Sequence, residues 1–132
     1  KLSSNRNYKD GKRDGLWETY YENGQLSRKF NYKNNKLDDL WETYHKNGQL
    51  KEKGNYKDYK REGLWETYYE DGKLSSNRNY KNGKKDGLWE TYYENGQLKT
   101  KGNYKEGIRE VPMEYYDEDG KLLFKHDTND EK

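Results

Sequence analysis

The stretch GLWETYYENGQL, residues 87–98, decides the fold, because it returns along the chain at a fixed interval of 24 residues. No insertion or deletion interrupts the interval. A strict period of this kind is typical of repeat proteins, in which each small unit buries its apolar face against its neighbours. The tryptophan of the stretch marks the units most clearly, at Trp17, Trp41, Trp65 and Trp89, with Met113 in the fifth place.

Each unit is predicted to be a β-hairpin. The runs that flank its turn are rich in Trp, Thr and Tyr, which favour strands. Between the runs lies an Asn-Gly or Asp-Gly dipeptide, the pair that a two-residue type I′ turn prefers. The connection to the next hairpin, such as residues 9–15, is more polar, and we expect a longer loop there. Asn35, Asp39 and Tyr59 replace glycine in these connections, so unusual backbone angles are expected at them. The turn dipeptides are Asn23-Gly24, Asn47-Gly48, Asp71-Gly72, Asn95-Gly96 and Asp119-Gly120.

A two-residue turn also predicts which residues face each other across the hairpin. One face then carries the tryptophans, and the other places Glu directly opposite Lys in four of the five units. Glu66 is the exception, because it faces Asn77. Opposite charges at such positions contribute about 0.2–1 kcal/mol per pair, and their recurrence supports the register. In the first hairpin the predicted pairs are Tyr21–Leu26, Tyr20–Ser27, Thr19–Arg28, Glu18–Lys29 and Trp17–Phe30.

The same register gives the tryptophans distinctive neighbours. Trp41 faces Gly54, and a large ring can lie over a strand glycine and supply the packing that the glycine lacks. Trp89 faces a glycine in the same way. Trp65 faces Arg78, where we expect a cation–π contact.

Composition excludes several classes of protein. Only 27% of the residues are hydrophobic and 39% are charged, yet the chain has 15 Tyr and 4 Trp, which suits a thin structure with half-buried rings. The 27 basic and 25 acidic residues nearly cancel and are interleaved, which disfavours nucleic acid as a partner. With no Cys and two isolated His, we expect no metal site, no cofactor and no catalytic residue.

The predicted architecture is all-β: an elongated, single-layer antiparallel meander of repeated β-hairpins, open at both ends. Residues 1–126 are expected to form one array of five units, the first of them partial, and residues 127–132 a solvated tail. Pro112 would lie opposite Asp127 and cannot donate a hydrogen bond there, so strand pairing should stop near Met113 and His126.

The stretch at residues 87–98, together with GNYKEG at residues 102–107, resembles the bacterial variant of the MORN repeat. The resemblance covers roughly residues 1–124. It implies an elongated array of hairpins that serves as a docking or assembly surface. Phospholipid binding has been proposed for such repeats, and some bacterial relatives are labelled as antitoxin components, so a membrane-lipid partner is implied by family analogy alone.

We therefore expect a non-enzymatic scaffold that binds a partner protein, in a bacterial envelope, secreted or toxin–antitoxin context rather than an ordinary cytoplasmic one. One alternative is a carbohydrate- or cell-wall-binding module that uses the aromatic residues. Homo-oligomers through exposed edge strands are a further expectation. The residues expected to contact a partner are Trp17, Tyr21, Trp41, Trp65, Tyr69, Trp89 and Tyr93.

Overall fold

The computed structural model describes residues 4–126, and all regular structure within them is β-strand. Eleven strands form one antiparallel sheet in chain order, and β2 and β3 form a separate two-stranded sheet. Within these residues no helix is long and apolar enough to cross a membrane. The strands are β1 (Ser4–Asn5), β2 (Tyr8–Lys9), β3 (Lys12–Arg13), β4 (Gly15–Tyr20), β5 (Leu26–Lys33), β6 (Lys36–Tyr44), β7 (Leu50–Lys57), β8 (Lys60–Tyr68), β9 (Leu74–Lys81), β10 (Lys84–Tyr92), β11 (Leu98–Lys105), β12 (Ile108–Tyr116) and β13 (Leu122–His126).

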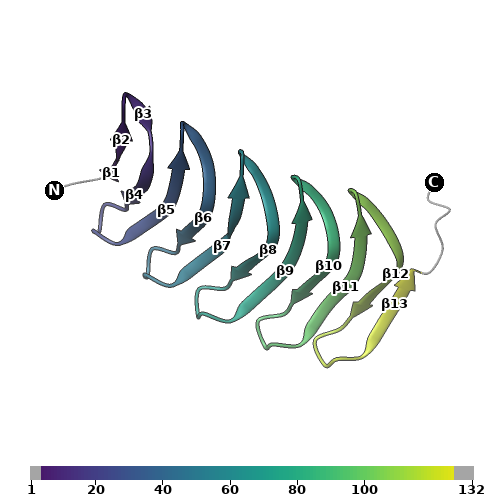
Figure 1. Ribbon diagram of the computed structural model, residues 1–132. Helices are drawn as coiled ribbons and strands as arrows, with labels where there is room; N and C mark the ends of the chain where they lie inside the picture. The colour runs from purple at the N-terminus through teal and green to yellow at the C-terminus, as the bar shows by residue number, and fades with distance from the viewer. Residues whose placement is uncertain (1–3, 127–132) are drawn as a thin grey trace.

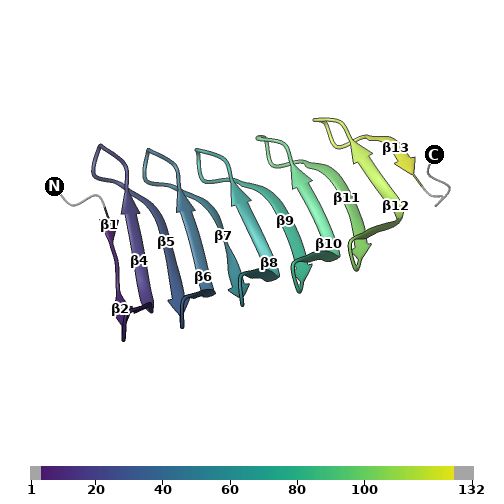
Figure 2. The ribbon, with the colours of Figure 1, turned by 90° about the horizontal axis from the view of Figure 1, so that it is seen from above.

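The large sheet is open, elongated and one layer thick (Figures 1 and 2). Successive strands lie side by side, so β1 and β13 lie at opposite ends of the array. The hairpin tips form one long edge of the array, and the turns that join successive hairpins form the other. The predicted single-layer antiparallel meander is confirmed.

The hairpin tips do not have the predicted two-residue turn. The first tip has three residues, closed by hydrogen bonds from Gly24 N to Tyr21 O (3.0 Å) and from Tyr21 N to Gln25 O (2.8 Å). Of these loop residues only Gly24 has a positive φ, +89°, which is the pattern of a type I turn followed by a left-handed glycine. The Asn23 side chain accepts a hydrogen bond from Gln25 N and donates to the carbonyl of Lys46 in the next tip. Asn-Gly suits both turn types, and these side-chain bonds favour the one observed.

The type I′ turns lie on the opposite edge instead. Asn34 (φ +55°) and Asn35 (φ +70°) are both left-handed, and they are the only two residues between β5 and β6. The expected longer loop is therefore wrong, because the polar residues after the turn already belong to the next strand. Tyr59 and Asp39 have a φ of +72° each, as predicted. The Tyr59 hydroxyl donates to the carbonyl of Asn35 in the preceding turn.

An irregularity in β5 restores the predicted register. The three-residue tip shifts the pairing by one position, so Tyr20 faces Leu26 rather than Ser27. Ser27 is then an extra, bulged residue, and the predicted pairing resumes beyond it. The predicted partners of Tyr20 and Tyr21 are wrong for this reason. The pairs Thr19–Arg28, Glu18–Lys29 and Trp17–Phe30 are confirmed.

A wider bulge precedes each tryptophan. In β8 the register changes between Glu62 and Glu66, and Gly63 within this bulge has a φ of +76°. Trp65 lies at the end of the bulge, and its indole N–H donates to the carbonyl of Asn55 in the preceding strand (3.0 Å). The bulge therefore turns the ring toward the strand that comes before it. Equivalent bonds join Trp17 to Asn7 and Trp89 to Asn79.

Neighbouring units are tied together at their tips by two rows of side-chain hydrogen bonds. In the first row a tyrosine hydroxyl or a histidine ring nitrogen donates to a backbone carbonyl one unit further along. In the second row the amide of the turn asparagine donates to a carbonyl of the next tip. The first row donates from Tyr21, His45, Tyr69 and Tyr93, and the second from Asn23, Asn47 and Asn95.

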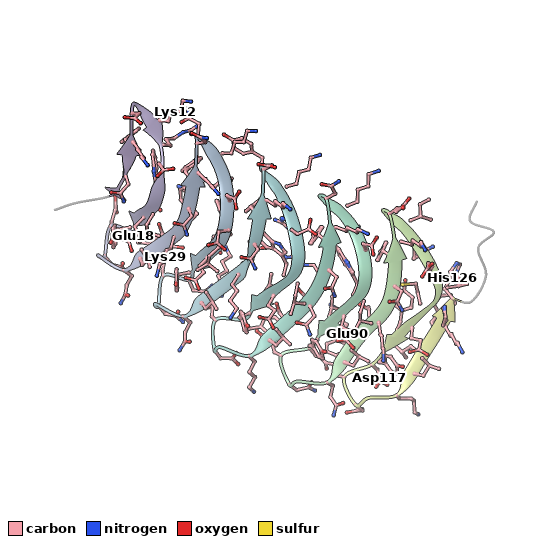
Figure 3. All side chains as sticks on the ribbon, in the orientation of Figure 1. Lys12, Glu18, Lys29, Glu90, Asp117 and His126 are labelled. Atoms are coloured by element: carbon pink, nitrogen blue, oxygen red, sulfur yellow. The ribbon has the colours of Figure 1, made fainter. Side chains whose placement is uncertain are left out.

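The fifth tip is closed differently. Asp117 stands where the other tips have Tyr or His, and its carboxylate accepts the backbone N–H groups of Asp119 and Lys121, each at 2.9 Å. The side chain is thus bound within its own turn and does not donate to a further unit. Asp117 lies at this last tip in Figure 3.

The pairing of β12 with β13 begins at Met113 and His126, where the sequence predicts that it stops. Pro112 lies within β12, next to this last pair. Its predicted neighbour Asp127 and the predicted solvated tail, residues 127–132, lie outside the described residues.

Asp71 interrupts the second row of hydrogen bonds between tips, in which turn asparagines donate to the next tip. Its carboxylate accepts a hydrogen bond from Lys73 N (2.9 Å), but it cannot donate to the next tip as Asn23 does. We predict that Asp71→Asn supplies this donor and raises the free energy of unfolding by about 0.5–1.5 kcal/mol. Urea unfolding monitored by tryptophan fluorescence measures the change.

Asp119→Asn is the matched control, because it makes the same chemical change at a tip that no further unit follows among the described residues. Its effect should be much smaller. Equal shifts in the two variants would show that the lost charge, rather than the new hydrogen bond, changes the stability.

Candidate functional site

The aromatic face carries a continuous row of rings along the array. Tyr56 and Tyr80, each from the second strand of a hairpin, lie between the Trp rings of their own hairpin and the next, and Phe30 takes this place in the first hairpin. The contacts are edge-to-face: Trp41 and Tyr56 have centroids 5.4 Å apart at 73°, and Tyr56 and Trp65 have centroids 5.1 Å apart at 84°. This aromatic row consists of Tyr8, Trp17, Phe30, Tyr32, Trp41, Tyr56, Trp65, Tyr80, Trp89 and Tyr104.

Trp65 lies in the middle of this row and is 0% exposed. Its ring covers Gly54, where an added Cβ would come within 2.1 Å of the ring, so no side chain fits there. The guanidinium of Arg61 lies over the same ring, 4.3 Å from its centroid. Glu52 holds Arg78 at 2.8 Å and Arg61 at 3.8 Å. This charged cluster covers the middle of the row, which explains how a one-layer sheet contains a fully buried ring.

All three of the expected tryptophan contacts involve other residues. Trp65 does face Arg78, but the cation over its ring is Arg61, because Glu52 holds the Arg78 guanidinium. Trp41 does face Gly54, but the ring over this glycine belongs to Trp65 in the following strand. The bulge before each tryptophan explains why the ring covers a glycine of the preceding strand, since it turns the ring toward that strand. Met113 covers Gly102 in the same way.

The residues expected to contact a partner fall into two groups. The tryptophans lie in the aromatic row, where one is buried and three are half-buried. The tyrosines lie at the hairpin tips, and their hydroxyls are bonded to the next unit. Partner binding by either group remains a prediction. The first group is Trp17, Trp41, Trp65 and Trp89, and the second is Tyr21, Tyr69 and Tyr93.

Sequence reasoning missed the cluster of Glu52, Arg61 and Arg78. The position of Glu52 carries a different residue in every hairpin, such as Arg28 and Ser76, so comparing the units hides it. A single carboxylate in a row of otherwise neutral or basic positions was the available signal. It became informative only once the register placed it near two arginines.

The opposite, charged face carries the Glu–Lys pairs. Glu18 faces Lys29 within the first hairpin, and Lys29 also faces Glu42 of the next, so the pairs join into a ladder across the strands. Figure 3 shows Glu18 and Lys29 close together on β4 and β5. The Tyr20 hydroxyl donates to Glu18 on this face (3.0 Å). The predicted opposite-charge pairs are confirmed.

The tyrosines of the charged face remain protonated through neutral pH. Burial, followed by the hydrogen bond to Glu66, raises the pKa of Tyr68 to about 12, and the pKa of Tyr44 is raised in the same way. The stability contributed by these neutral hydroxyls is present below the ordinary tyrosine pKa of about 10 and is lost as the pH rises above it. At physiological pH they donate to the glutamates and help to fix the ladder.

Outside the aromatic row and the charged face, the surface consists of the hairpin tips and the turns that join successive hairpins. Within residues 4–126 no group of three or more His, Asp or Glu is placed to hold a metal ion. Two open cavities between successive turns have equivalent linings and lie two units apart. His45 takes the structural role of a tip tyrosine, with Nε2 bonded to the carbonyl of Tyr68 (2.9 Å).

The family model described as the MORN repeat variant matches five segments, which together cover most of the chain: residues 13–34, 40–58, 61–82, 85–106 and 109–130. The chain belongs to this family. The predicted MORN relationship is confirmed, and no curated protein matches the chain. MORN repeats are generally non-catalytic modules that mediate contacts with proteins or membrane lipids.

The buried ring of Trp65 should contribute most to the stability of the MORN array. We predict that Trp65→Ala lowers the free energy of unfolding by about 3–5 kcal/mol, as expected for removal of a buried aromatic ring. Glu66→Ala should cost less than about 1 kcal/mol, because its charge lies on the half-exposed ladder. Similar shifts in thermal unfolding would show that the aromatic row is not the main source of stability.

Asn77 interrupts the Glu–Lys ladder between Glu66 and Glu90, and its side-chain oxygen is buried without a hydrogen-bond donor among the described residues. We predict that Asn77→Lys completes the ladder and stabilises the protein by about 0.2–1 kcal/mol for each new pair. The gain should shrink in high salt. Asn77→Gln is the uncharged control, and a salt-independent gain in both variants would contradict the electrostatic explanation.

Proposed function

We propose that this MORN array is a non-enzymatic scaffold whose aromatic face binds a partner protein. The observation that carries the proposal is the state of the aromatic row: it runs along the array without a second layer, and Trp17, Trp41 and Trp89 are only half-buried. Partly exposed aromatic rings on a rigid support provide contact area at low entropic cost, and such rings dominate protein interfaces.

The polar groups between the rings also favour a protein partner. Arg28 is exposed on the aromatic face, and Thr43 lies beside it with its side chain half-buried. Arg, Trp and Tyr are the residue types enriched where interfaces bind most strongly. The family's general role in protein or lipid contacts agrees with this proposal.

The carbohydrate alternative is less well supported by the ring geometry. A sugar stacks on an open ring face, whereas these ring faces meet the edges of neighbouring rings. Trp41, for example, meets Tyr56 at 73°. Cations take further ring faces, since Arg13 lies 4.4 Å from the centroid of Tyr32 and Lys85 lies 4.8 Å from that of Trp89. We retain the bacterial envelope, secreted or toxin–antitoxin setting as part of the proposal, on the family resemblance alone.

The proposal can be tested with a photo-reactive residue placed on either face. At position 43 it lies on the aromatic face, and at position 55 it lies on the charged face of the neighbouring strand. We expect crosslinks to one defined protein from position 43 and none from position 55 in cells that encode the chain. Thr43→Glu should then weaken binding of that purified partner at least about tenfold, which corresponds to 1.4 kcal/mol.

Asn55→Glu is the matched control, because it adds the same charge to an exposed position on the charged face. It should leave partner binding unchanged. Loss of binding in Asn55→Glu alone would place the partner on the charged face. Binding of the wild-type protein to a glycan array, removed by Thr43→Glu, would favour the carbohydrate alternative instead.

A further inference from the structure

Folding sorts charges that are interleaved in the sequence. The edge formed by the hairpin tips carries mainly acidic residues, such as Glu22, Glu70, Glu94 and Glu118. The edge formed by the two-residue turns carries lysines at regular positions. Lys12 marks this edge in Figure 3, at the end of the array opposite His126.

Two lysines face each other across four of the five turns on this edge. Directly opposite residues of an antiparallel pair project to the same side, so the two ammonium groups of each pair are neighbours. All eight lysines are exposed. The ion pairs found among residues 4–126 involve Arg61, Arg78 and Glu52 and none of these lysines. The pairs, which we call the lysine ladder, are Lys9–Lys12, Lys33–Lys36, Lys57–Lys60 and Lys81–Lys84.

The lysine ladder destabilises the sheet locally, because like charges directly opposite each other repel. The turns themselves do not require it. A type I′ turn needs left-handed residues at its two central positions, and it places no demand on the flanking pair. The fifth turn has the same geometry with Lys105 opposite Ile108. A repulsive charge pair that destabilises the sheet, recurs at the same position in successive units and is not required by the turn is typical of a binding surface.

Acidic residues near the ladder limit how much negative charge a partner can bring. An open cavity of about 340 Å³ between the first two turns is lined by Lys9, Lys12 and Lys33, but also by Asp10 and Asp14. A second such cavity, of about 310 Å³, has an equivalent lining between the third and fourth turns. Each of the two cavities therefore offers a small excess of positive charge. This excess suits sparse negative charges better than the dense charge of a nucleic acid backbone.

The spacing of the ladder indicates the shape of the partner. Successive rungs are two strands apart, which is about 9.6 Å at the usual strand spacing. A polyproline II helix has three residues per turn and rises about 3.1 Å per residue, so every third side chain projects to the same side at intervals of about 9.3 Å. Carboxylates at every third position would meet one lysine rung each.

We propose that the lysine ladder binds an acidic polyproline II segment of a partner protein, with Asp or Glu at every third residue. This inference rests on the proposed scaffold function and adds a second contact surface to it. The ammonium groups supply point charges that suit carboxylates presented one per rung. Binding also relieves the repulsion within each lysine pair.

A synthetic peptide of four Glu-Pro-Pro triplets is the probe, and a peptide of the same composition with all glutamates adjacent is its control. Titration calorimetry at low salt measures both. The ladder variant replaces Lys12, Lys36, Lys60 and Lys84 by Gln. The control variant replaces Lys29, Lys53, Lys101 and Lys125 by Gln. It removes the same amount of charge, but from the Glu–Lys pairs of the charged face.

We expect the ladder variant to bind the triplet peptide at least about tenfold more weakly, and the control variant to change less than about twofold. Stability should move the other way: the ladder variant should unfold at a higher temperature than the wild type, and the control variant at a lower one. If the ladder lysines had only a structural role, replacing them would not weaken peptide binding while raising the unfolding temperature. The triplet peptide should also bind more tightly than the clustered one.

Several results would overturn the inference. Equal weakening in both variants would show that net charge alone attracts the peptide. Equal binding of the clustered peptide would remove the argument from spacing. Tighter binding of a single-stranded oligonucleotide, or of vesicles with anionic lipid, at the same salt concentration would assign the ladder to those partners. No binding of the wild-type protein to the peptide would reject this inference but leave the crosslinking test of the aromatic face unaffected.

Discussion

Edge-to-face contact between Trp and Tyr rings of adjacent strands is the interaction on which the rest of this structure depends. A one-layer sheet has no second layer against which to bury apolar groups, and only 27% of this chain is hydrophobic. The rings must therefore bury one another. The wide bulge before each tryptophan makes this geometry accessible, because it turns the ring over the preceding strand. At Trp17, Trp65 and Trp89 it also gives the indole N–H a carbonyl there. Glycine at positions such as Gly54 then leaves room for the ring.

Much of this fold can be predicted from the sequence, since the period, the hairpins and the central register follow from repetition and alternation. The pair Glu18–Lys29 is predicted correctly although the tip is not, because the extra tip residue and the bulged Ser27 offset each other. The turn types cannot be predicted in this way. Asn-Gly and Asp-Gly are compatible with two turns, and in the observed one the side-chain oxygen of Asn23 or Asp71 accepts a hydrogen bond from the backbone N–H two residues later. The preference of the dipeptide alone does not distinguish the two turns.

The candidate surfaces can likewise be predicted from the sequence only in part. The sequence predicts a row of tryptophans, because their spacing matches the repeat. It does not predict which of them is buried, because the cover on Trp65 comes from Glu52, Arg61 and Arg78 in three different strands. The lysine ladder was hidden for another reason. Asp10 and Asp14 are interleaved with Lys9 and Lys12 in the sequence, and only a two-residue turn places the lysines directly opposite each other.

The carboxylate of Asp117 determines where further units can be added to the array. A unit inserted between two existing ones would meet a tyrosine, histidine or asparagine donor on the tip that precedes it, and it would bring its own donors to the tip that follows. A unit joined after the fifth tip would place a carbonyl oxygen against the carboxylate of Asp117, where the earlier tips have a tyrosine or histidine donor. Internal duplication is therefore compatible with the chemistry of these junctions, whereas extension beyond this tip requires a new residue at position 117. A carboxylate at the position of Asp119 does not prevent extension, because Asp71 holds the same position in the third tip and a further unit follows it.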